Sequence, residues 1–165
     1  MAKANLVLIQ ALRKTAKRMR TGTSYQWGHF GSCNCGHLVQ TLTNFTKGEI
    51  HSAAKEKNGD WGDLSRDFCS TSGLKIDKII KLMLQAGLNI EDIENLENLG
   101  DRKVLSRMKI DSNKLKHNKI LDVVAYMEEW ADLLESELNL DVEKAQKSLN
   151  PKTTPHKYNV STATS

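Results

Sequence analysis

Residues 120–140 read ILDVVAYMEEWADLLESELNL, and their apolar side chains recur every three or four positions. This spacing places them along one face of an α-helix, with most of the acidic side chains on the opposite face. We expect the helix to begin near residue 114, to end at residue 140 and to bury its apolar stripe. The stripe consists of Ile120, Val123, Val124, Met127, Trp130, Ala131 and Leu134.

The rest of the chain has the composition of an all-α protein. Of its 165 residues, 39% are hydrophobic and only 5% are aromatic, and good helix formers dominate. Both prolines, Pro151 and Pro155, lie beyond the long helix. We predict a compact bundle of six or seven helices in a single domain, residues 1–140, followed by a flexible tail, residues 141–165. Shorter helices or helical pieces are expected over residues 4–20, 35–45, 46–58, 60–69, 76–86, 89–96 and 101–108.

The charges at the two ends of the predicted domain have opposite signs. The first acidic residue is Glu49, whereas every charged residue between Lys119 and Lys144 is acidic. The first and last helices also both have apolar stripes that must be buried. We therefore predict that the two helices pack side by side. The expected contacts set Leu8, Leu12 and Met19 against Val123, Met127 and Trp130.

A different use of the basic first helix is open. Arg13, Lys17 and Arg20 fall on one helix face and could contact nucleic-acid phosphates, or the chain could be a structural interaction module. Nucleic acid is the less favoured partner, because the chain after residue 48 is net acidic. A homo-oligomer is compatible with the sequence.

One segment has the residue types of a metal site. Residues 25–37 read YQWGHFGSCNCGH and contain the pattern His-x3-Cys-x-Cys-x-His within a glycine-rich loop that follows the first helix. Thiolate and imidazole groups are ligands that zinc and iron accept. We predict transition-metal binding, zinc first and iron second, with His51 or Cys69 as candidate additional ligands. The predicted ligands are His29, Cys33, Cys35 and His37.

An alternative interpretation of the same segment is a thiol enzyme. A cysteine at a helix N-terminus meets unpaired N–H groups that lower its pKa, and Cys35 or Cys33 would lie there. Cys35 with the residues after it resembles the nucleophile segment of NlpC-type cysteine peptidases, and residues 26–33 are similar to the papain-like pattern. Both families place their histidine on a β-strand, and we predict none here. The activity is therefore not carried over, and ordinary packing of buried cysteines is the third interpretation.

Several other sequence features, most of them the absence of a known motif, exclude or disfavour particular classes of function. Asp60 and Asp63 are three residues apart near a turn, where capping of a helix is favoured over ion binding. No phosphate-binding loop, dinucleotide glycine pattern or Gly-x-Ser-x-Gly motif is present. The longest apolar run, residues 6–9, is too short for a membrane span. The three cysteines do not form a disulfide framework, so we expect a cytoplasmic protein, and the Lys, Asn and Ile usage suggests a bacterial source.

Overall fold

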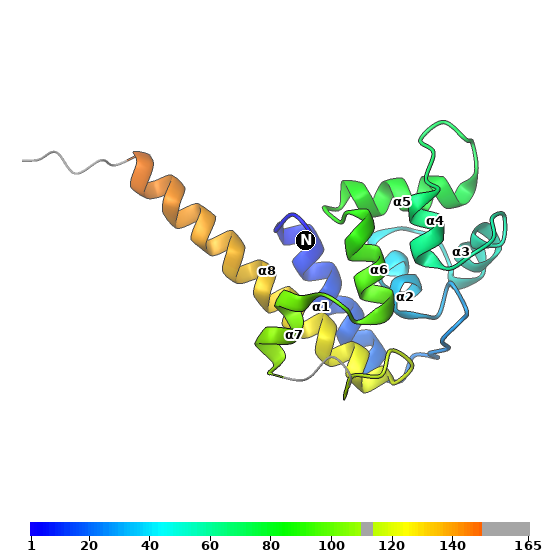
Figure 1. Ribbon diagram of the computed structural model, residues 1–165, viewed down its shortest axis with the longest axis horizontal. Helices are drawn as coiled ribbons and strands as arrows, with labels where there is room; N and C mark the ends of the chain where they lie inside the picture. Colours follow the sequence, from blue (N-terminus) through cyan, green and yellow to red (C-terminus); the bar gives the residue numbers. More distant parts are fainter. Residues whose placement is uncertain (110–113, 150–165) are drawn as a thin grey trace, which may run out of the picture.

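A computed structural model describes residues 1–109 and 114–149, and every regular element in them is an α-helix (Figure 1). The all-α prediction is confirmed, with one or two helices more than expected. The described helices are α1 (Leu6–Arg20), α2 (Asn34–Leu42), α3 (Lys47–Ala54), α4 (Trp61–Arg66), α5 (Lys75–Gln85), α6 (Ile90–Asn98), α7 (Arg102–Met108) and α8 (Ile120–Leu149).

The first and last helices form the most extensive contact between described helices, as the sequence predicts. They run side by side in opposite directions along one side of the bundle (Figure 1). Burying six large side chains of this kind supplies most of the stabilisation of the interface. All six side chains predicted to meet are buried in one core: Leu8, Leu12, Met19, Val123, Met127 and Trp130.

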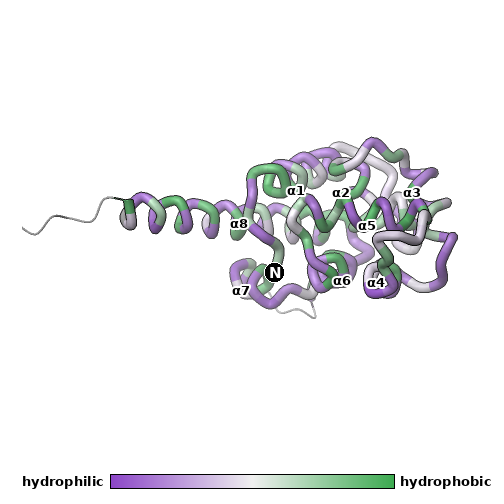
Figure 2. The backbone as a smooth tube through the Cα atoms, turned by 90° about the horizontal axis from the view of Figure 1, so that it is seen from above, coloured by the Kyte–Doolittle hydropathy of each residue, from purple (hydrophilic) through white to green (hydrophobic). Residues whose placement is uncertain are grey.

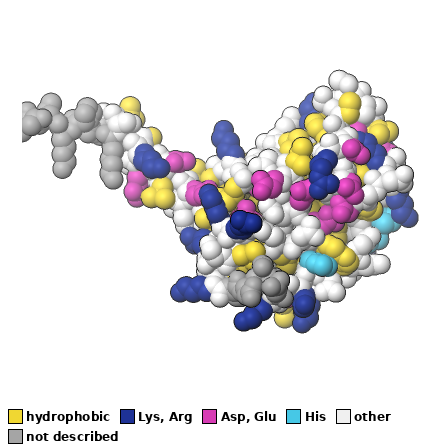
Figure 3. All heavy atoms as spheres, in the orientation of Figure 1, with side chains coloured by type: hydrophobic (Ala, Val, Ile, Leu, Met, Phe, Trp, Pro, Cys, Tyr) yellow, Lys and Arg dark blue, Asp and Glu magenta, His cyan; other side chains and the backbone are white. Residues whose placement is uncertain are grey.

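Ion pairs flank this apolar interface. The Arg13 guanidinium contacts Asp132 at 2.7 Å and Glu135 at 2.8 Å, and Arg20 contacts Glu128 at 2.6 Å. All five side chains are substantially exposed, so each pair stabilises little and mainly fixes orientation. Two arginines of the basic first helix are therefore used within the protein. On the face shown in Figure 3, basic side chains lie among acidic ones along α8 and the adjacent part of the bundle.

Several helices begin at the capping residues that the sequence predicts. Capping boxes pair Thr46 with Glu49, Asp60 with Asp63, and Asn89 with Asp92. The Asp101 side chain accepts from the first turn of α7. The capping interpretation of the Asp60–Asp63 pair is thus confirmed, because its oxygens satisfy backbone N–H groups that the helix leaves unpaired.

Both ends of the longest helix differ from the prediction. α8 begins at Ile120 instead of near residue 114, and it continues to Leu149, so that residues 141–149 of the expected flexible tail are helical. Neither Gly nor Pro occurs between the expected end and Pro151, and nothing in the sequence breaks the helix. Figures 1 and 2 show this last part of α8 projecting from the bundle. Residues 150–165 of the predicted tail lie outside the described residues.

α2 occupies the interior of the bundle and contacts α1, α3, α5 and α6. The glycine-rich loop before it, residues 21–32, folds back onto its first turn. A Cβ atom on Gly36 would lie 1.9 Å from the carbonyl oxygen of Phe30, and one on Gly31 would lie 1.9 Å from that of Lys47. These two glycines are therefore required by close backbone approach, which brings the loop and the cysteines against the core.

Candidate functional site

The two cysteines of the predicted metal site lie at the start of α2. Cys33 is the N-cap residue and Cys35 is in the first turn, and both side chains are buried. The indole Nε1–H of Trp61 donates to Cys33 Sγ at 3.1 Å, whereas the Cys35 thiol donates to the Ile93 carbonyl at 3.4 Å. The two thiols thus face different partners.

Burial decides the protonation of these thiols. It raises the pKa of Cys33 to about 11 and the pKa of Cys35 well above its ordinary value. The hydrogen bonds that Cys33 receives lower its pKa but do not offset the loss of solvent. A thiol nucleophile needs the opposite shift, so the direction of both pKa shifts disfavours the thiol-enzyme interpretation.

His37 is held in the core of the bundle. Arg18 donates to the His37 carbonyl oxygen at 2.7 Å and lies 3.5 Å from Nδ1, and the imidazole stacks against the Tyr25 ring. Burial, with the charge of Arg18, lowers the pKa of His37 to about 4. Its Nε2 atom is buried and has no hydrogen-bond partner among the described residues. His37 is therefore a neutral core side chain.

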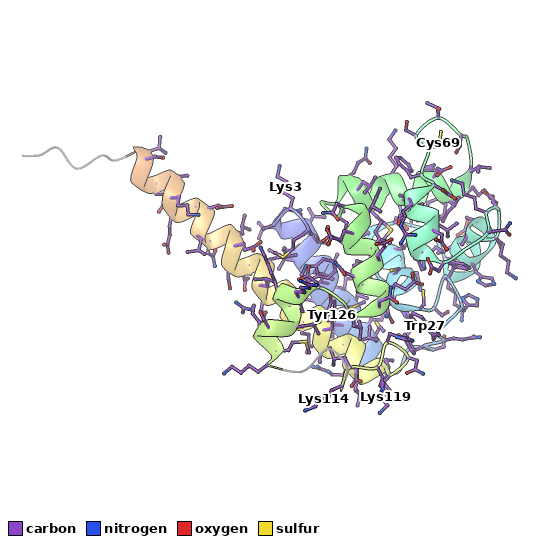
Figure 4. The ribbon with its side chains drawn as sticks, viewed as in Figure 1. Lys3, Trp27, Cys69, Lys114, Lys119 and Tyr126 are labelled. Atoms are coloured by element: carbon purple, nitrogen blue, oxygen red, sulfur yellow. The ribbon has the colours of Figure 1, made fainter. Side chains whose placement is uncertain are left out.

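His29 lies in the glycine-rich loop and faces His51 of α3 instead of the cysteines. The two rings stack with centroids 3.8 Å apart and planes 12° apart. The Gly31 N–H donates to His29 Nδ1 at 3.2 Å. Cys69, the other candidate ligand, lies in the loop between α4 and α5, far from Trp27 in Figure 4. Within residues 1–109 and 114–149, no three His, Cys, Asp or Glu side chains are grouped as a metal site. The four predicted ligands are thus not gathered into one set.

A cleft of about 330 Å³ opens beside Cys33. Its walls come from three segments that are distant in sequence: the glycine-rich loop with the start of α2, the start of α4, and the end of α6. This volume is at the lower end of the range for small-molecule sites. We call it the aromatic cleft, and it is lined by Trp27, Gly28, Phe30, Cys33, Gly59, Asp60, Trp61 and Glu97.

Glu97 supplies the buried polar group of the aromatic cleft. Its side chain is only 8% exposed, and its Oε2 atom has no hydrogen-bond partner among the described residues. Burial, together with the negative charge of Asp60, raises the pKa of Glu97 to about 7, although the backbone N–H groups of Gly62 and Trp61 act in the other direction. A buried oxygen without a partner is costly, so it is available to a bound group.

Polar contacts fix the walls of the aromatic cleft relative to each other. Asn34 Nδ2 donates to the carbonyl oxygens of Leu96 and Glu97, at 3.1 and 3.0 Å, which ties the start of α2 to the end of α6. The Trp27 ring lies 4.0 Å from that of His117, at the periphery of the bundle (Figure 4). The start of α2 and the end of α6 are therefore held against each other at the cleft.

Two lining residues of the aromatic cleft stand out in the sequence for other reasons, Cys33 as a predicted metal ligand and Asp60 as a predicted helix cap. The aromatic walls have a usable signal, since Trp27 and Trp61 each precede a glycine in a chain with few aromatic residues. Glu97 has none, because it lies among other acidic residues of α6 and only its neighbours in space bury it.

Comparisons with known proteins find no matching protein family, curated protein or solved structure. Among the described helices, none is both long enough and apolar enough to cross a membrane.

Proposed function

We propose that this protein binds a small organic molecule in the aromatic cleft. The observation that carries the proposal is the buried Glu97 carboxyl, whose Oε2 atom lacks a partner among the described residues at a cleft with aromatic walls. Binding sites for small molecules combine apolar walls with a few fixed polar groups, and this cleft has both.

The exposure of Trp27 supports the same proposal. Trp27 is 37% exposed although it is large and apolar, and its ring lies tilted against that of His117, with the planes 35° apart, instead of entering the core. Covering Trp27 and Phe30 with the apolar part of a ligand would remove this surface from water, at roughly 25 cal/mol per Å². A ligand can thus gain affinity from the walls and orientation from Glu97.

Nuclear magnetic resonance of the labelled full chain tests the proposal. Benzyl alcohol and benzylamine are small enough for the cleft, and we expect at least one of them to shift the resonances of Trp27, Phe30 and Glu97 with millimolar affinity. Trp27→Ala should weaken this binding severalfold. Leu140→Ala, which truncates an exposed apolar side chain of α8 outside the lining of the cleft, is the matched control and should leave it unchanged. If neither probe shifts these resonances, the proposed function is wrong.

Transition-metal binding is a second candidate function, favoured by one observation. His29 and His51 are already in contact, and the His51 Nδ1 atom is buried without a hydrogen-bond partner among the described residues. We propose zinc first and iron second as the metal. A metal ion lies close to the plane of each imidazole ring that binds it, and stacked rings have no such position in common. One of the two rings must therefore turn before both can bind one ion.

Zinc titration of untagged protein tests this second candidate. The wild type should bind zinc, and His51→Gln should weaken binding by more than about tenfold, since even the loss of a group that only orients a ligand costs about 10–100-fold. His117→Gln is the matched control, because this histidine packs on Trp27 and not on His29. Equal zinc affinity in the wild type and in His29→Gln and His51→Gln proteins would exclude the pair as ligands.

A further inference from the structure

The charges that line the aromatic cleft have one sign. Glu97 and Asp60 are its two ionisable carboxyl groups, and none of the described lining residues is Lys or Arg. Figure 3 shows acidic side chains gathered over α4 and α6, beside hydrophobic and histidine side chains. The potential in the cleft is therefore negative when the carboxyl groups are ionised.

The nearest basic side chain of α4 is already used elsewhere. Arg66 pairs with Asp63 at 2.9 Å and also contacts Glu94 of α6. It therefore neutralises the outer carboxylates of these two helices, while no described lining residue supplies a cation to Glu97. The buried carboxyl group therefore meets the backbone N–H groups of Trp61 and Gly62 but no basic side chain among the described lining residues.

We propose that the ligand of the aromatic cleft is a small organic cation, an ammonium group carried on an apolar body. Its charge would contact the Glu97 carboxylate, and its apolar body would lie against Trp27 and Phe30. This inference rests on the proposed function and names the chemical class of its ligand.

Both parts of such a ligand find a suitable surface. The faces of tryptophan and phenylalanine rings carry negative electrostatic potential and attract ammonium groups within about 6 Å. A carboxylate that burial penalises regains favourable interaction when an opposite charge binds beside it. An anionic ligand would instead face two carboxyl groups with no compensating base in the lining, and a neutral ligand would use the walls but not the charge.

Three probes that share one ring separate these possibilities. Benzylamine, benzyl alcohol and benzoate differ in the charge of one substituent, and calorimetric titration of the full chain measures the affinity of each. We expect benzylamine to bind about tenfold more tightly than benzyl alcohol, in line with a cation–π contact joined to a charge pair. Benzoate should bind most weakly.

Two variants locate the charge preference. Glu97→Gln keeps the shape of the side chain, and it should bring benzylamine and benzyl alcohol to similar affinity. Asp60→Asn keeps the helix cap, since asparagine also caps, and should reduce the preference for benzylamine by only a few fold. Glu91→Gln, at an exposed position of the same helix as Glu97, is the matched control and should keep the wild-type preference.

The outcomes distinguish the inference from the function on which it rests. If benzylamine and benzyl alcohol bind the wild type equally well, the cleft binds organic molecules but the inference of a cation is wrong. If benzoate binds most tightly, the inference is also wrong. If none of the three probes binds, the proposed function and the inference both fail.

Discussion

The α1–α8 interface and the junction of the glycine-rich loop with α2 are held together in different ways. The interface buries six large apolar side chains along two helix faces, with exposed ion pairs at its edges. The junction depends on single contacts, such as the approach of Phe30 to Gly36 and the hydrogen bonds of Asn34 to the end of α6. The repeating apolar stripes of two helices specify the α1–α8 interface, whereas a few close contacts between individual atoms specify the junction of the loop with α2.

The same contrast explains what became of the chemically suggestive residues. Cys33, Cys35 and His37 suggest a metal site by their density in the sequence. In the structure each has its own partner: a buried indole, a buried backbone carbonyl and a half-buried arginine. A high local density of ligand-type residues therefore does not by itself make them converge on one point.

The largest expected effect is on the interface. Met127→Ala should lower the free energy of unfolding by about 2–5 kcal/mol, because it leaves a cavity between two helices that cannot close. Urea denaturation measures the change. Leu121→Ala is the matched control on the same helix, since Leu121 is exposed, and should change stability by less than about 0.5 kcal/mol. Equal effects of the two substitutions would show that the interface is not the main source of stability.

The next effect concerns Glu97 and pH. Because burial raises the pKa of Glu97 to about 7 from an ordinary 4.5, the native state holds a proton there that the unfolded state has released. This contribution to stability is complete below the ordinary pKa and is lost as pH rises through about 7. Relative to the wild type, Glu97→Gln should therefore gain up to about 3 kcal/mol of stability across this interval. A difference between the two proteins that is independent of pH would contradict the burial of Glu97.

His37 should show the opposite dependence in the same experiments. Its pKa falls from 6.5 to about 4 on folding, so the unfolded state binds a proton that the native state does not. The wild type should thus lose this part of its stability as pH falls from about 6.5 to about 4. In the wild type, the pH dependences of stability that come from His37 and Glu97 have opposite signs and partly cancel. Removing the carboxyl group in Glu97→Gln should therefore make the loss of stability caused by His37 at low pH measurable.

A smaller change in stability is expected from adding one methyl group at the junction of the glycine-rich loop with α2. Gly36→Ala should destabilise the protein by about 2 kcal/mol or more, since its methyl group would meet the Phe30 carbonyl oxygen and force the loop away from α2. The matched control is Gly48→Ala in α3, where a Cβ atom meets nothing within 4 Å. That substitution should stabilise by about 0.5–1 kcal/mol, as alanine does in an open helix position. Chemical denaturation compares them, and a stabilising Gly36→Ala would refute the close approach.

The smallest effect concerns the ion pairs that flank the interface. A double-mutant cycle between Arg20 and Glu128 should give a coupling energy of about 0.2–1 kcal/mol, because both side chains are exposed. The coupling should shrink in high salt, which screens exposed charges. A coupling well above this range that persists in high salt would mean that charge, and not apolar burial, holds α1 to α8.

The features predicted correctly are those that depend on neighbours in the sequence. Helical spacing predicts the stripes of α1 and α8, and capping residues such as Thr46, Asn89 and Asp101 mark where α3, α6 and α7 begin. The end of α8 was misplaced because a polar composition after residue 140 is compatible with either a tail or a solvated helix. The helix propensity of residues 141–149 outweighs the polar composition that suggested a tail, and α8 continues to Leu149.

The sequence by itself thus determined most of the helices and several of their caps, because period and capping act over one or two turns. It also determined the pairing of the first helix with the last, because their apolar stripes need burial and their charges are opposite. Only the tertiary structure decided which polar side chains become buried away from water. Glu97 acquires its raised pKa from burial against α4 and the glycine-rich loop, segments distant from it along the chain, and its Oε2 atom has no partner among the described residues. Burial is a property of neighbours in space, and the pKa, the hydrogen-bond partners and the aromatic cleft all follow from it.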